Sequence, residues 1–229
     1  MRAVITGASR GIGLEFVRQL LHRGGSVEAA VRSPQRANGL RRLAGDFPRT
    51  LRIYSCDVAA EASVRAFAAS LSSEPVDLLI NNAGIGEARA TLEELDLDNA
   101  VVAFQVNALG AIRVTRAVLA WLRRSSVRKA IHITSKMGSI SENDSGDSYA
   151  YRMSKAALNM ASRSMAIDLR EDRIISAVIH PGWVRTDMGG TGAPTSVEDS
   201  VSGMIRVIDG LTMEQSGSFL DYRGQKIPW

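Results

Sequence analysis

Short apolar runs alternate with helix-periodic segments along the whole chain of 229 residues. The first unit reads RAVIT, then GASRGIG, then LEFVRQLLHRG, the pattern of a strand, a glycine-rich turn and a helix. Several runs are continuously apolar, as expected where both faces of a sheet are covered. The alternation predicts an α/β fold in a single domain over residues 1–229. It favours a doubly wound parallel sheet of the Rossmann type with helices on both faces.

The element boundaries follow from the same pattern. We expect strands at 2–6, 26–32, 51–58, 76–84, 129–135, 173–182 and 217–224. Beyond the first helix, which Gly24 and Gly25 end, we expect helices at 62–71, 94–122, 150–170 and 196–211. In such a sheet a ligand lies beyond the carboxyl ends of the strands, so polar residues at those ends are the candidates for a site.

Charge and composition limit the partners. The net charge is +4, the aromatic content is 5%, and the basic residues are scattered along the chain, so we expect no nucleic-acid partner. One denser basic run, RRSSVRK at 123–129, has two readings. It is either a solvated helix end and loop, or a weak patch for anionic lipid or a partner, which leaves peripheral membrane contact open.

The cysteine, histidines and hydropathy of the sequence do not indicate a disulfide-bonded, metal-binding or membrane-spanning protein. Cys56 is the single cysteine, so an intramolecular disulfide is impossible. His22, His132 and His180 are spread over a helix and two strands, and we expect no metal site. The sequence has no run of 18 or more apolar residues, so we expect no transmembrane helix, and no signal peptide is visible. These patterns lead us to expect a cytoplasmic protein.

The glycine-rich turn after the first strand predicts a cofactor site. Its glycines have the spacing G-x-x-x-G-x-G, which departs from the standard G-x-G-x-x-G fingerprint. Glycines here permit a tight turn and let main-chain N–H groups approach a pyrophosphate at the start of the helix. We therefore expect NAD(P), with contacts from Gly7, Ser9, Arg10, Gly11, Ile12 and Gly13.

Polar residues stand at the ends of other strands, where one sheet edge would bring them together. They are Arg32, Asp57, Asn81, Ser135 and the Pro181–Gly182 turn. Asp57 suits a hydrogen bond from an adenine amino group. Asn81 either stabilises its loop or touches the ribose.

The end of the second strand indicates which dinucleotide binds. A site selective for NAD usually has an acid there for the ribose 2′-hydroxyl, whereas this chain has Val31, Arg32 and Ser33. Arg10 adds a second guanidinium in the glycine-rich turn, and two guanidiniums favour a 2′-phosphate. The sequence therefore leans to NADP(H) and leaves NAD(H) open.

The stretch YAYRMSK at 149–155 contains a candidate acid–base pair. Tyr151 and Lys155 are four residues apart, so on a helix they differ by only about 40° around the axis. Tyr149 lies six residues from Lys155 and falls on another face, which favours packing or substrate contact. Because tyrosine ordinarily titrates near about pH 10, Tyr151 needs partners that stabilise its anion.

Six motifs occur in the order and spacing of the short-chain dehydrogenases/reductases, so the chain resembles that family. They are TGASRGIG, NNAG at 81–84, Asn107 in QVNALG, Ser135 in ITSKMG, Tyr151 and Lys155 in YRMSK, and PGWVRT at 181–186. The resemblance covers nearly the whole chain. It implies an NAD(P)-dependent oxidoreductase that transfers a hydride between the nicotinamide and a secondary alcohol or carbonyl.

The resemblance also implies a role for each matched residue. Tyr151 would exchange a proton with the substrate oxygen, while Lys155 and the oxidised nicotinamide would lower the Tyr151 pKa. Tyr151 and Lys155 would also contact the cofactor, Lys155 at the nicotinamide ribose. Ser135 would hydrogen-bond the substrate oxygen, Asn107 would hold a water that links Lys155 to solvent, and Thr186 would hold the carboxamide. The remaining implied cofactor contacts are Val58, Ala83, Gly84, Pro181, Gly182 and Val184.

The chain departs from the family pattern near the substrate. Ser135 precedes Tyr151 by 16 residues, where many members have about 13, and the extra residues fall in SENDSGDS. The acids of that loop predict an acidic mouth to the site. Ser139 and Ser141 are alternative hydroxyls, although Ser135 is the one at a strand end. Glycines in 187–198 suggest a mobile lid.

The resemblance also bears on assembly and biological role. Family members commonly pair the helices at 98–122 and 150–170 across an interface, which implies a homodimer or homotetramer. SYAYRMSKAALNM and the ending GSFLDYRGQKIPW resemble carbonyl-reductase-like members, including one linked to contact-dependent developmental signalling at the cell envelope, in fruiting-body formation and sporulation. Substrates would be a small-molecule or lipid alcohol or carbonyl. The alternative role is a signalling module in which catalysis is secondary.

Overall fold

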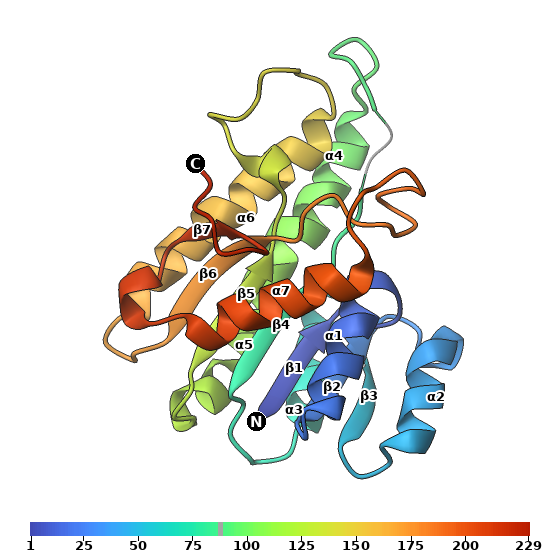
Figure 1. Ribbon diagram of the computed structural model, residues 1–229, viewed down its shortest axis with the longest axis vertical. Helices are drawn as coiled ribbons and strands as arrows, with labels where there is room; N and C mark the ends of the chain where they lie inside the picture. The colour runs from blue at the N-terminus through green and yellow to red at the C-terminus, as the bar shows by residue number, and fades with distance from the viewer. Residues whose placement is uncertain (87–88) are drawn as a thin grey trace.

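The computed structural model describes residues 1–86 and 89–229 and contains one sheet of seven parallel strands in the order β3-β2-β1-β4-β5-β6-β7 (Figure 1). The strands are β1 Arg2–Thr6, β2 Ser26–Val31, β3 Leu51–Ser55, β4 Leu78–Asn81, β5 Lys129–Ile133, β6 Ile175–His180 and β7 Phe219–Asp221. Strand succession reverses between β1 and β4, which is the switch point where open α/β sheets bind their ligands. The predicted fold class is confirmed.

Helices connect the strands on both sides of the sheet. They are α1 Gly11–His22, α2 Asn38–Asp46, α3 Glu61–Ser70, α4 Leu97–Phe104, α5 Gly110–Arg124, α6 Tyr149–Asp168 and α7 Val197–Gly210. Short 3-10 turns occur at η1 Pro34–Arg36, η3 Lys136–Gly138 and η4 Met213–Gln215.

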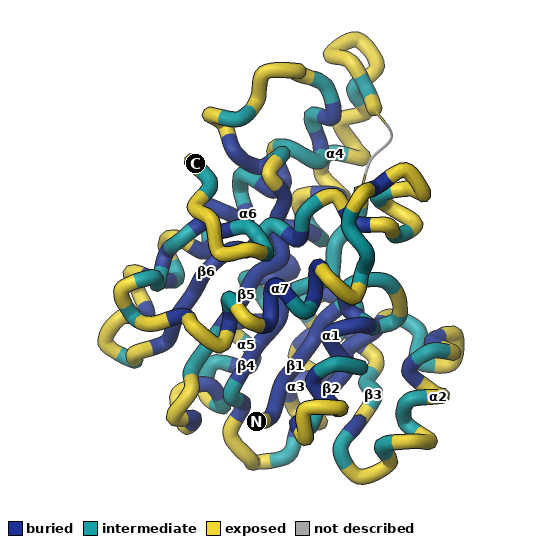
Figure 2. The backbone as a smooth tube through the Cα atoms, viewed as in Figure 1, coloured by how far each residue is buried: buried dark blue, intermediate teal, exposed yellow. Residues whose placement is uncertain are grey.

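The sheet separates two hydrophobic cores, and adjacent residues of β1 show this. Ile5 joins the core beneath α1, α2 and α7, which includes Phe16 and Met204. Val4 points the other way, into the core with Phe67 of α3 and the buried side of α5. Figure 1 shows α1 and α7 side by side across one face, and in Figure 2 the buried residues concentrate along the strands. Burial on both faces explains the continuous apolar runs.

The segment expected to be one regular helix at 94–122 is helical from Leu97 onward but changes its hydrogen-bonding pattern partway along. A π-helical turn, η2 Gln105–Leu109, stands between α4 and α5. Asn107 sits in this turn and is 1% exposed, and its amide is bonded outside the helix, as described below. Gly110 then packs on Val58, where a Cβ would lie 2.9 Å from Val58 Cγ2. The apolar periodicity predicted the helix but carried no sign of the wider turn.

The continuous helical segment Leu97–Arg124 is long and apolar enough to cross a membrane by length and composition alone. This differs from the sequence expectation, which counted uninterrupted apolar runs. In its most apolar window, 44% of the segment is buried inside the fold. Val114, Val118 and Leu122 are fully buried in the core with β4 and β5, so the segment packs as a core helix does.

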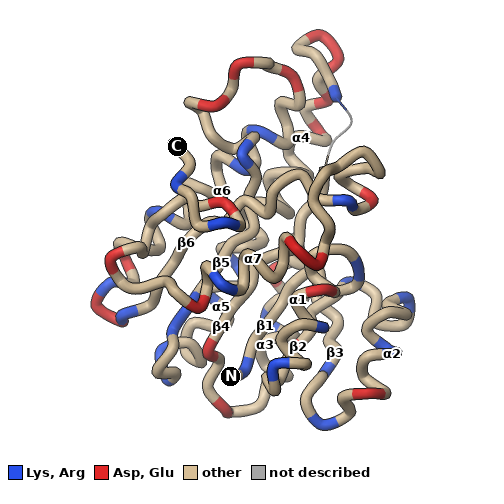
Figure 3. Tube along the Cα trace, in the orientation of Figure 1, with Lys and Arg blue, Asp and Glu red and all other residues tan. Residues whose placement is uncertain are grey.

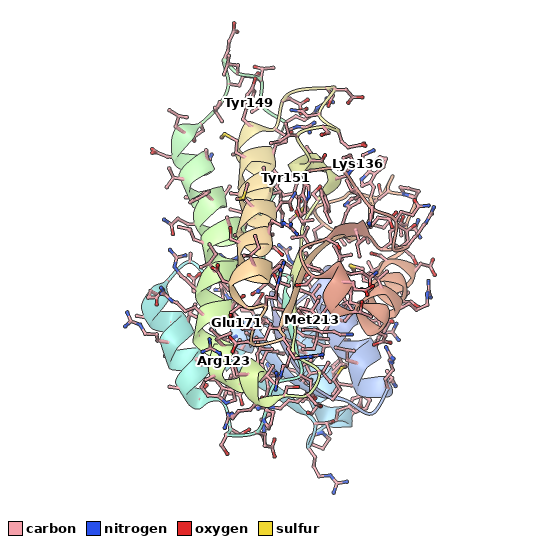
Figure 4. The ribbon with its side chains drawn as sticks, turned by 90° about the vertical axis from the view of Figure 1, so that its left-hand side faces the viewer. Arg123, Lys136, Tyr149, Tyr151, Glu171 and Met213 are labelled. Carbon is pink, nitrogen blue, oxygen red and sulfur yellow. The ribbon has the colours of Figure 1, made fainter. Side chains whose placement is uncertain are left out.

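The basic run at 123–129 makes interactions within the protein. Arg123 pairs with Asp172 at 2.8 Å, and Arg128 donates to the Asp172 main-chain oxygen at 2.9 Å. Lys129 Nζ donates to the Ile208 oxygen at 2.6 Å, at the end of α7. Charges of both signs are interspersed over the trace in Figure 3, and Figure 4 places Arg123 beside Glu171, well below Tyr151 and past the other end of α6. These contacts favour the reading of a helix end and loop.

Candidate active site

The glycine-rich turn packs directly on the loop after β4. Gly7 and Gly11 have φ of +64° and +52°, in the left-handed region that favours glycine. A Cβ at Gly7 would lie 2.7 Å from Ala83 Cα, and one at Gly13 would collide with the Gly7 main-chain oxygen. Gly7 and Gly13 are therefore required by close packing, and Gly7 also by its conformation.

The start of α1 fits an anionic group. Within the described segment 1–86, α1 begins at Gly11 with neither a side-chain cap from Arg10 nor an acid in its first turn. Its first N–H groups and the positive end of the helix dipole therefore suit a phosphate. Ser9 and Ile12 are half-buried in the same turn. The turn thus fits the pyrophosphate of a dinucleotide.

Asn82 ties the two loops together and was missed by the sequence reasoning. Its Nδ2 donates to the main-chain oxygens of Thr6 and Gly7 at 3.0 and 3.1 Å. Thr6 Oγ1 accepts in turn from the N–H groups of Asn82 and Ala83, both at 3.1 Å. The only signal for this role was the doubled asparagine in NNAG, directly before Ala83 and Gly84.

The two arginines expected at the 2′-phosphate differ in their surroundings. Arg32 is exposed immediately after β2. Arg10 Nη1 pairs with Asp187 Oδ2 at 2.6 Å, and both side chains are largely exposed. The neighbouring Thr186 Cγ2 lies 3.4 Å from where a Cβ on Gly11 would stand. The pair therefore joins the glycine-rich turn to the segment after β6, and Asp187 is a residue that the sequence reasoning did not select.

Three residues expected at strand ends lie there, and their side chains make different contacts. They are Asp57, Val58 and Asn81. Asp57 Oδ1 accepts from the Ala59 N–H at 3.0 Å and so fixes the turn after β3. Val58 is buried. Asn81 is 4% exposed. Its Nδ2 donates to Thr115 Oγ1 at 3.0 Å and lies within hydrogen-bonding distance of His132 Nδ1, at 3.1 Å. Its side chain points into the core, which favours loop stabilisation over ribose contact.

Ser135, Tyr151 and Lys155 come together at the carboxyl end of β5, where α6 begins. Ser135 directly follows the last buried residues of the strand, and the Tyr151 phenol hydrogen-bonds with it. Lys155 Nζ lies 5.7 Å from the Tyr151 ring centroid and donates to the Ile133 main-chain oxygen at 2.9 Å. Figure 4 shows Tyr149 at the tip of α6 and Tyr151 further along it. The structure thus groups the three residues that the family pattern selected.

Burial controls the protonation of this group. It lowers the pKa of Lys155 to about 8, because the ammonium is removed from water. Burial also raises the pKa of Tyr151 above its ordinary value, and the hydrogen bond from Ser135 offsets only part of that rise. Burial therefore outweighs the hydrogen bond from Ser135, and the expected lowering of the Tyr151 pKa would need the positive charge of the oxidised nicotinamide as well.

Asn107 braces the loop beside Lys155. Its Oδ1 accepts from the Ile85 N–H at 2.8 Å, and its Nδ2 donates to the Ile85 oxygen and to Ser154 Oγ, each at 2.9 Å. A Cβ on Gly84 would lie 3.2 Å from Asn107 Oδ1 and 3.5 Å from Lys155 Nζ. Asn107 is thus adjacent to Lys155, with both ends of its amide bonded to protein groups.

The segment after β6 lies at the same carboxyl edge of the sheet. Gly182 has φ +85° and packs on Tyr222. Val184 is buried and forms an isolated β-bridge with Thr195. Thr186 Oγ1 accepts from the Gly189 N–H at 3.1 Å, which folds the proposed lid back on itself. His180 precedes Pro181, and burial lowers its pKa to about 4.

The loop between Ser135 and Tyr151 is less acidic in effect than the sequence suggested. Glu142 pairs with Lys136, and Asp147 pairs with Arg89 at 2.6 Å. Gly146, Asp147 and Ser148 all have positive φ, and this turn takes up the long interval before α6. The expected acidic mouth is therefore largely neutralised, with Asp144 as its exposed acid.

Tyr151, Lys155 and Ser135 thus place a phenol, an ammonium and a hydroxyl at the sheet edge that also holds the glycine-rich turn. Residues 1–195 match the family model described as short chain dehydrogenase, which is most of the chain.

The chain belongs to the short chain dehydrogenase family.

Two kinds of relatives resemble this short chain dehydrogenase. C-signal of Myxococcus xanthus is 52% identical over 166 residues, covering 72% of this chain and 100% of that one. The NADPH-bound carbonyl reductase from chicken fatty liver has a TM-score of 0.95 at 37% identity, covering 100% and 98% of the two chains. The carbonyl reductase Sniffer of D. melanogaster has a TM-score of 0.94 at 31% identity, covering 100% and 99%.

Proposed function

We propose that residues 1–229 form one unit that catalyses NADP(H)-dependent hydride transfer between the nicotinamide and a carbonyl or secondary alcohol. The observation that carries this proposal is the grouping of Ser135, Tyr151 and Lys155 at the sheet edge that also holds the glycine-rich turn. Family membership and the likeness to carbonyl reductases support the reaction class.

The chain's own residues supply the proton chemistry, while the bound nicotinamide supplies or accepts the hydride. In reduction, Tyr151 donates its phenolic proton to the oxygen that gains charge, and in oxidation it takes that proton back. Ser135 donates a hydrogen bond to the same oxygen. Lys155 places a positive charge next to the phenol, and that charge favours the tyrosinate. Asn107 keeps the loop around Gly84 in place beside Lys155.

Cofactor choice rests on Arg10 and Arg32. The turn at Gly7–Gly13 suits the pyrophosphate, and Arg32 at the end of β2 is exposed where a 2′-phosphate would require a cation. The NADPH bound to the chicken carbonyl reductase supports the same choice. The remaining proposed contacts are Asp57, Val58, Ala83, Gly84, Pro181, Gly182, Val184 and Thr186.

A finer substrate proposal is a secondary hydroxyl on a glycerol-containing lipid head group. The basic run at 123–129 and the resemblance of the chain to C-signal together motivate it. The internal pairing of the basic run argues against strong membrane attraction by that run. If the proposal is right, phospholipid vesicles at low salt will drive NADP⁺ reduction, and no reduction under these conditions would exclude it.

We further propose a homodimer in which the α4 and α6 faces of two copies pack together. Val101, Phe104, Met153 and Met160 are exposed apolar side chains on these adjacent helices. Burying them would remove apolar surface from water. Light scattering should give a dimer mass for the wild type and a monomer mass for Val101→Glu/Met160→Glu.

The alternative function is a developmental signal at the cell envelope, with the fold serving as a recognition module. The identity to C-signal is the observation that favours it. A folded Ser135→Ala protein that still binds NADPH separates the two functions. If it restores development in a recipient lacking the signal, signalling does not need the chemistry; loss of rescue would tie the signal to catalysis.

The experiment that tests the proposed function is a cofactor-dependent screen of carbonyls, alcohols and lipids in both directions. Tyr151→Phe and Lys155→Met serve as the reporters on any substrate found. Each should lower turnover while leaving a folded protein. Unchanged turnover in both variants would reject the mechanism.

A further inference from the structure

Residues 226–229, here called the tail, fold back from β7 toward the active site. Asp221 N–H donates to the Gln225 oxygen at 2.8 Å, which closes a turn after β7. Ile227 N–H then donates to the Phe219 oxygen at 2.9 Å, and the Trp229 ring lies 5.5 Å from the Phe219 ring. Phe219 is buried, so the tail is anchored on the sheet.

The tail meets the loop that follows Ser135. Ser139 Oγ donates to the Pro228 main-chain oxygen at 2.6 Å. Ser141 donates to the Trp229 oxygen twice, from its N–H at 3.0 Å and from its Oγ at 2.9 Å. Figure 1 shows the end of the chain beside the segment that leads into α6. Ser139 is 2% exposed, so its bond is made away from water.

The opposite side of the same loop rests on the catalytic helix. A Cβ on Gly138 would lie 2.8 Å from Lys155 Cβ, so the loop backbone packs directly on the turn that carries Lys155. Asn159 Nδ2 donates to the Gly138 oxygen at 3.1 Å, and Thr134 Oγ1 donates to Asn159 Oδ1 at 2.6 Å. The loop is therefore held between the tail and α6.

This support reaches Ser135 through one tight turn. Gly138 N–H donates to the Ser135 oxygen at 2.9 Å, and Met137 N–H donates to Ser135 Oγ at 3.2 Å. Ser139 Oγ also accepts from the Glu142 N–H at 3.2 Å, so the hydroxyl is both a donor and an acceptor. A shift of Ser139 would move the turn whose first residue is Ser135.

We propose that the tail is a positioning element for Ser135, and that Ser139 is the positioning residue through which it acts. The tail presses the turn 135–139 onto α6 and fixes where the Ser135 hydroxyl points. Ser139 and Ser141 are then supports of the site and not alternative catalytic hydroxyls. The proposal rests on the proposed function only in that Ser135 contacts the substrate oxygen.

Hydrogen exchange tests the support without any substrate. Ser139→Ala leaves the Pro228 oxygen without its donor, and Trp229→Ala loosens the tail while keeping both serines. We expect amide exchange at 137–139 to rise about tenfold in each variant, because a buried bond is lost. The Met137 amide reports on Ser135 Oγ directly. Ser164→Ala, an exposed serine on α6, is the matched control and should not change exchange there. Unchanged exchange in both variants would overturn the proposal.

A double-mutant cycle tests the path through Ser135. NADPH-dependent reduction of a quinone probe is measured for Ser139→Ala in the wild-type and Ser135→Ala backgrounds. We expect kcat to fall about tenfold in the first background and less than about twofold in the second, because coupled residues are not additive. Equal losses in both backgrounds would show a general structural effect and reject the positioning role. If the wild type turns over none of the carbonyls in the screen described above, the proposed function fails, and the Met137 exchange alone decides on the tail.

Discussion

Lys155 Nζ donates a hydrogen bond to the Ile133 main-chain oxygen at 2.9 Å and lies 5.7 Å from the centroid of the Tyr151 ring. The four-residue spacing of Tyr151 and Lys155 accounts for their position on one face of α6. Ile133 ends β5, so the bond fixes the ammonium to the sheet edge as well as to α6. The charge that the phenol needs is therefore held by two elements.

Lys155 should titrate near pH 8 in the cofactor-free protein. Burial lowers its pKa to about 8, and an unfolded lysine titrates near about 10.4. The unfolded state thus binds more protons between these values, so this group's contribution to stability rises with pH across that window and is least favourable below pH 8. NMR of the four lysine side chains should show a midpoint near pH 8 that disappears in Lys155→Met. A Lys155 midpoint near 10.5 would contradict the burial argument.

His132 should make the protein less stable in mild acid. It is fully buried between Asn81 and Ser176 Oγ, which lies 3.1 Å from its Nε2, and burial lowers its pKa to about 4. Because an unfolded histidine takes up a proton near about pH 6.5, unfolding gains protons between 6.5 and 4 and stability falls as pH falls through that window. The contribution is about 2–3 kcal/mol by pH 4.5.

Urea unfolding at pH 7 and pH 4.5 measures this contribution. The loss of unfolding free energy between the two pH values should shrink in His132→Gln by about 2–3 kcal/mol. His22→Gln, a substitution near the surface of α1, is the control and should keep the wild-type loss. An unchanged loss in His132→Gln would mean that another group controls acid stability.

The sequence predicted the sheet and the Ser135–Tyr151–Lys155 group because both depend on local periodicity and on the family pattern. It could not assign Asn81, since a polar residue at a strand end can face either the groove or the core, and the packing of His132 and Thr115 decides between them. It also missed Asn82, Asp187 and the tail. Their partners lie far away in the chain, and only the folded sheet brings them together.

Asp187 should weaken binding of the 2′-phosphate cofactor. Its carboxylate pairs with Arg10 at 2.6 Å and so competes for a guanidinium proposed to bind that phosphate. The pair is exposed, and such pairs are weak, so Asp187→Asn should tighten NADPH binding only about two- to fivefold. NADH binding should not change, because NADH lacks the phosphate. Fluorescence titration gives both values, and equal tightening for the two cofactors would refute competition.

Gly138→Ala should separate the Ser135 loop from Lys155. The new Cβ would lie 2.8 Å from Lys155 Cβ and 2.9 Å from the Lys155 main-chain carbon. Such overpacking typically costs about 1–3 kcal/mol of unfolding free energy. Turnover should also fall at least about tenfold as Ser135 moves. Gly45→Ala, where a Cβ has open space within α2, is the control and should be neutral or slightly stabilising in thermal unfolding.

Transfer of deuterium from 4-deuterated NADPH to the carbonyl carbon of a ketone probe, followed in a single turnover, tests the central claim most directly. The wild type should place the label on the product carbon. Tyr151→Phe should still bind NADPH at saturating concentration and slow the transfer by about 10²–10⁴-fold, because it lacks the proton donor. Transfer at the wild-type rate in a folded Tyr151→Phe protein would contradict the account.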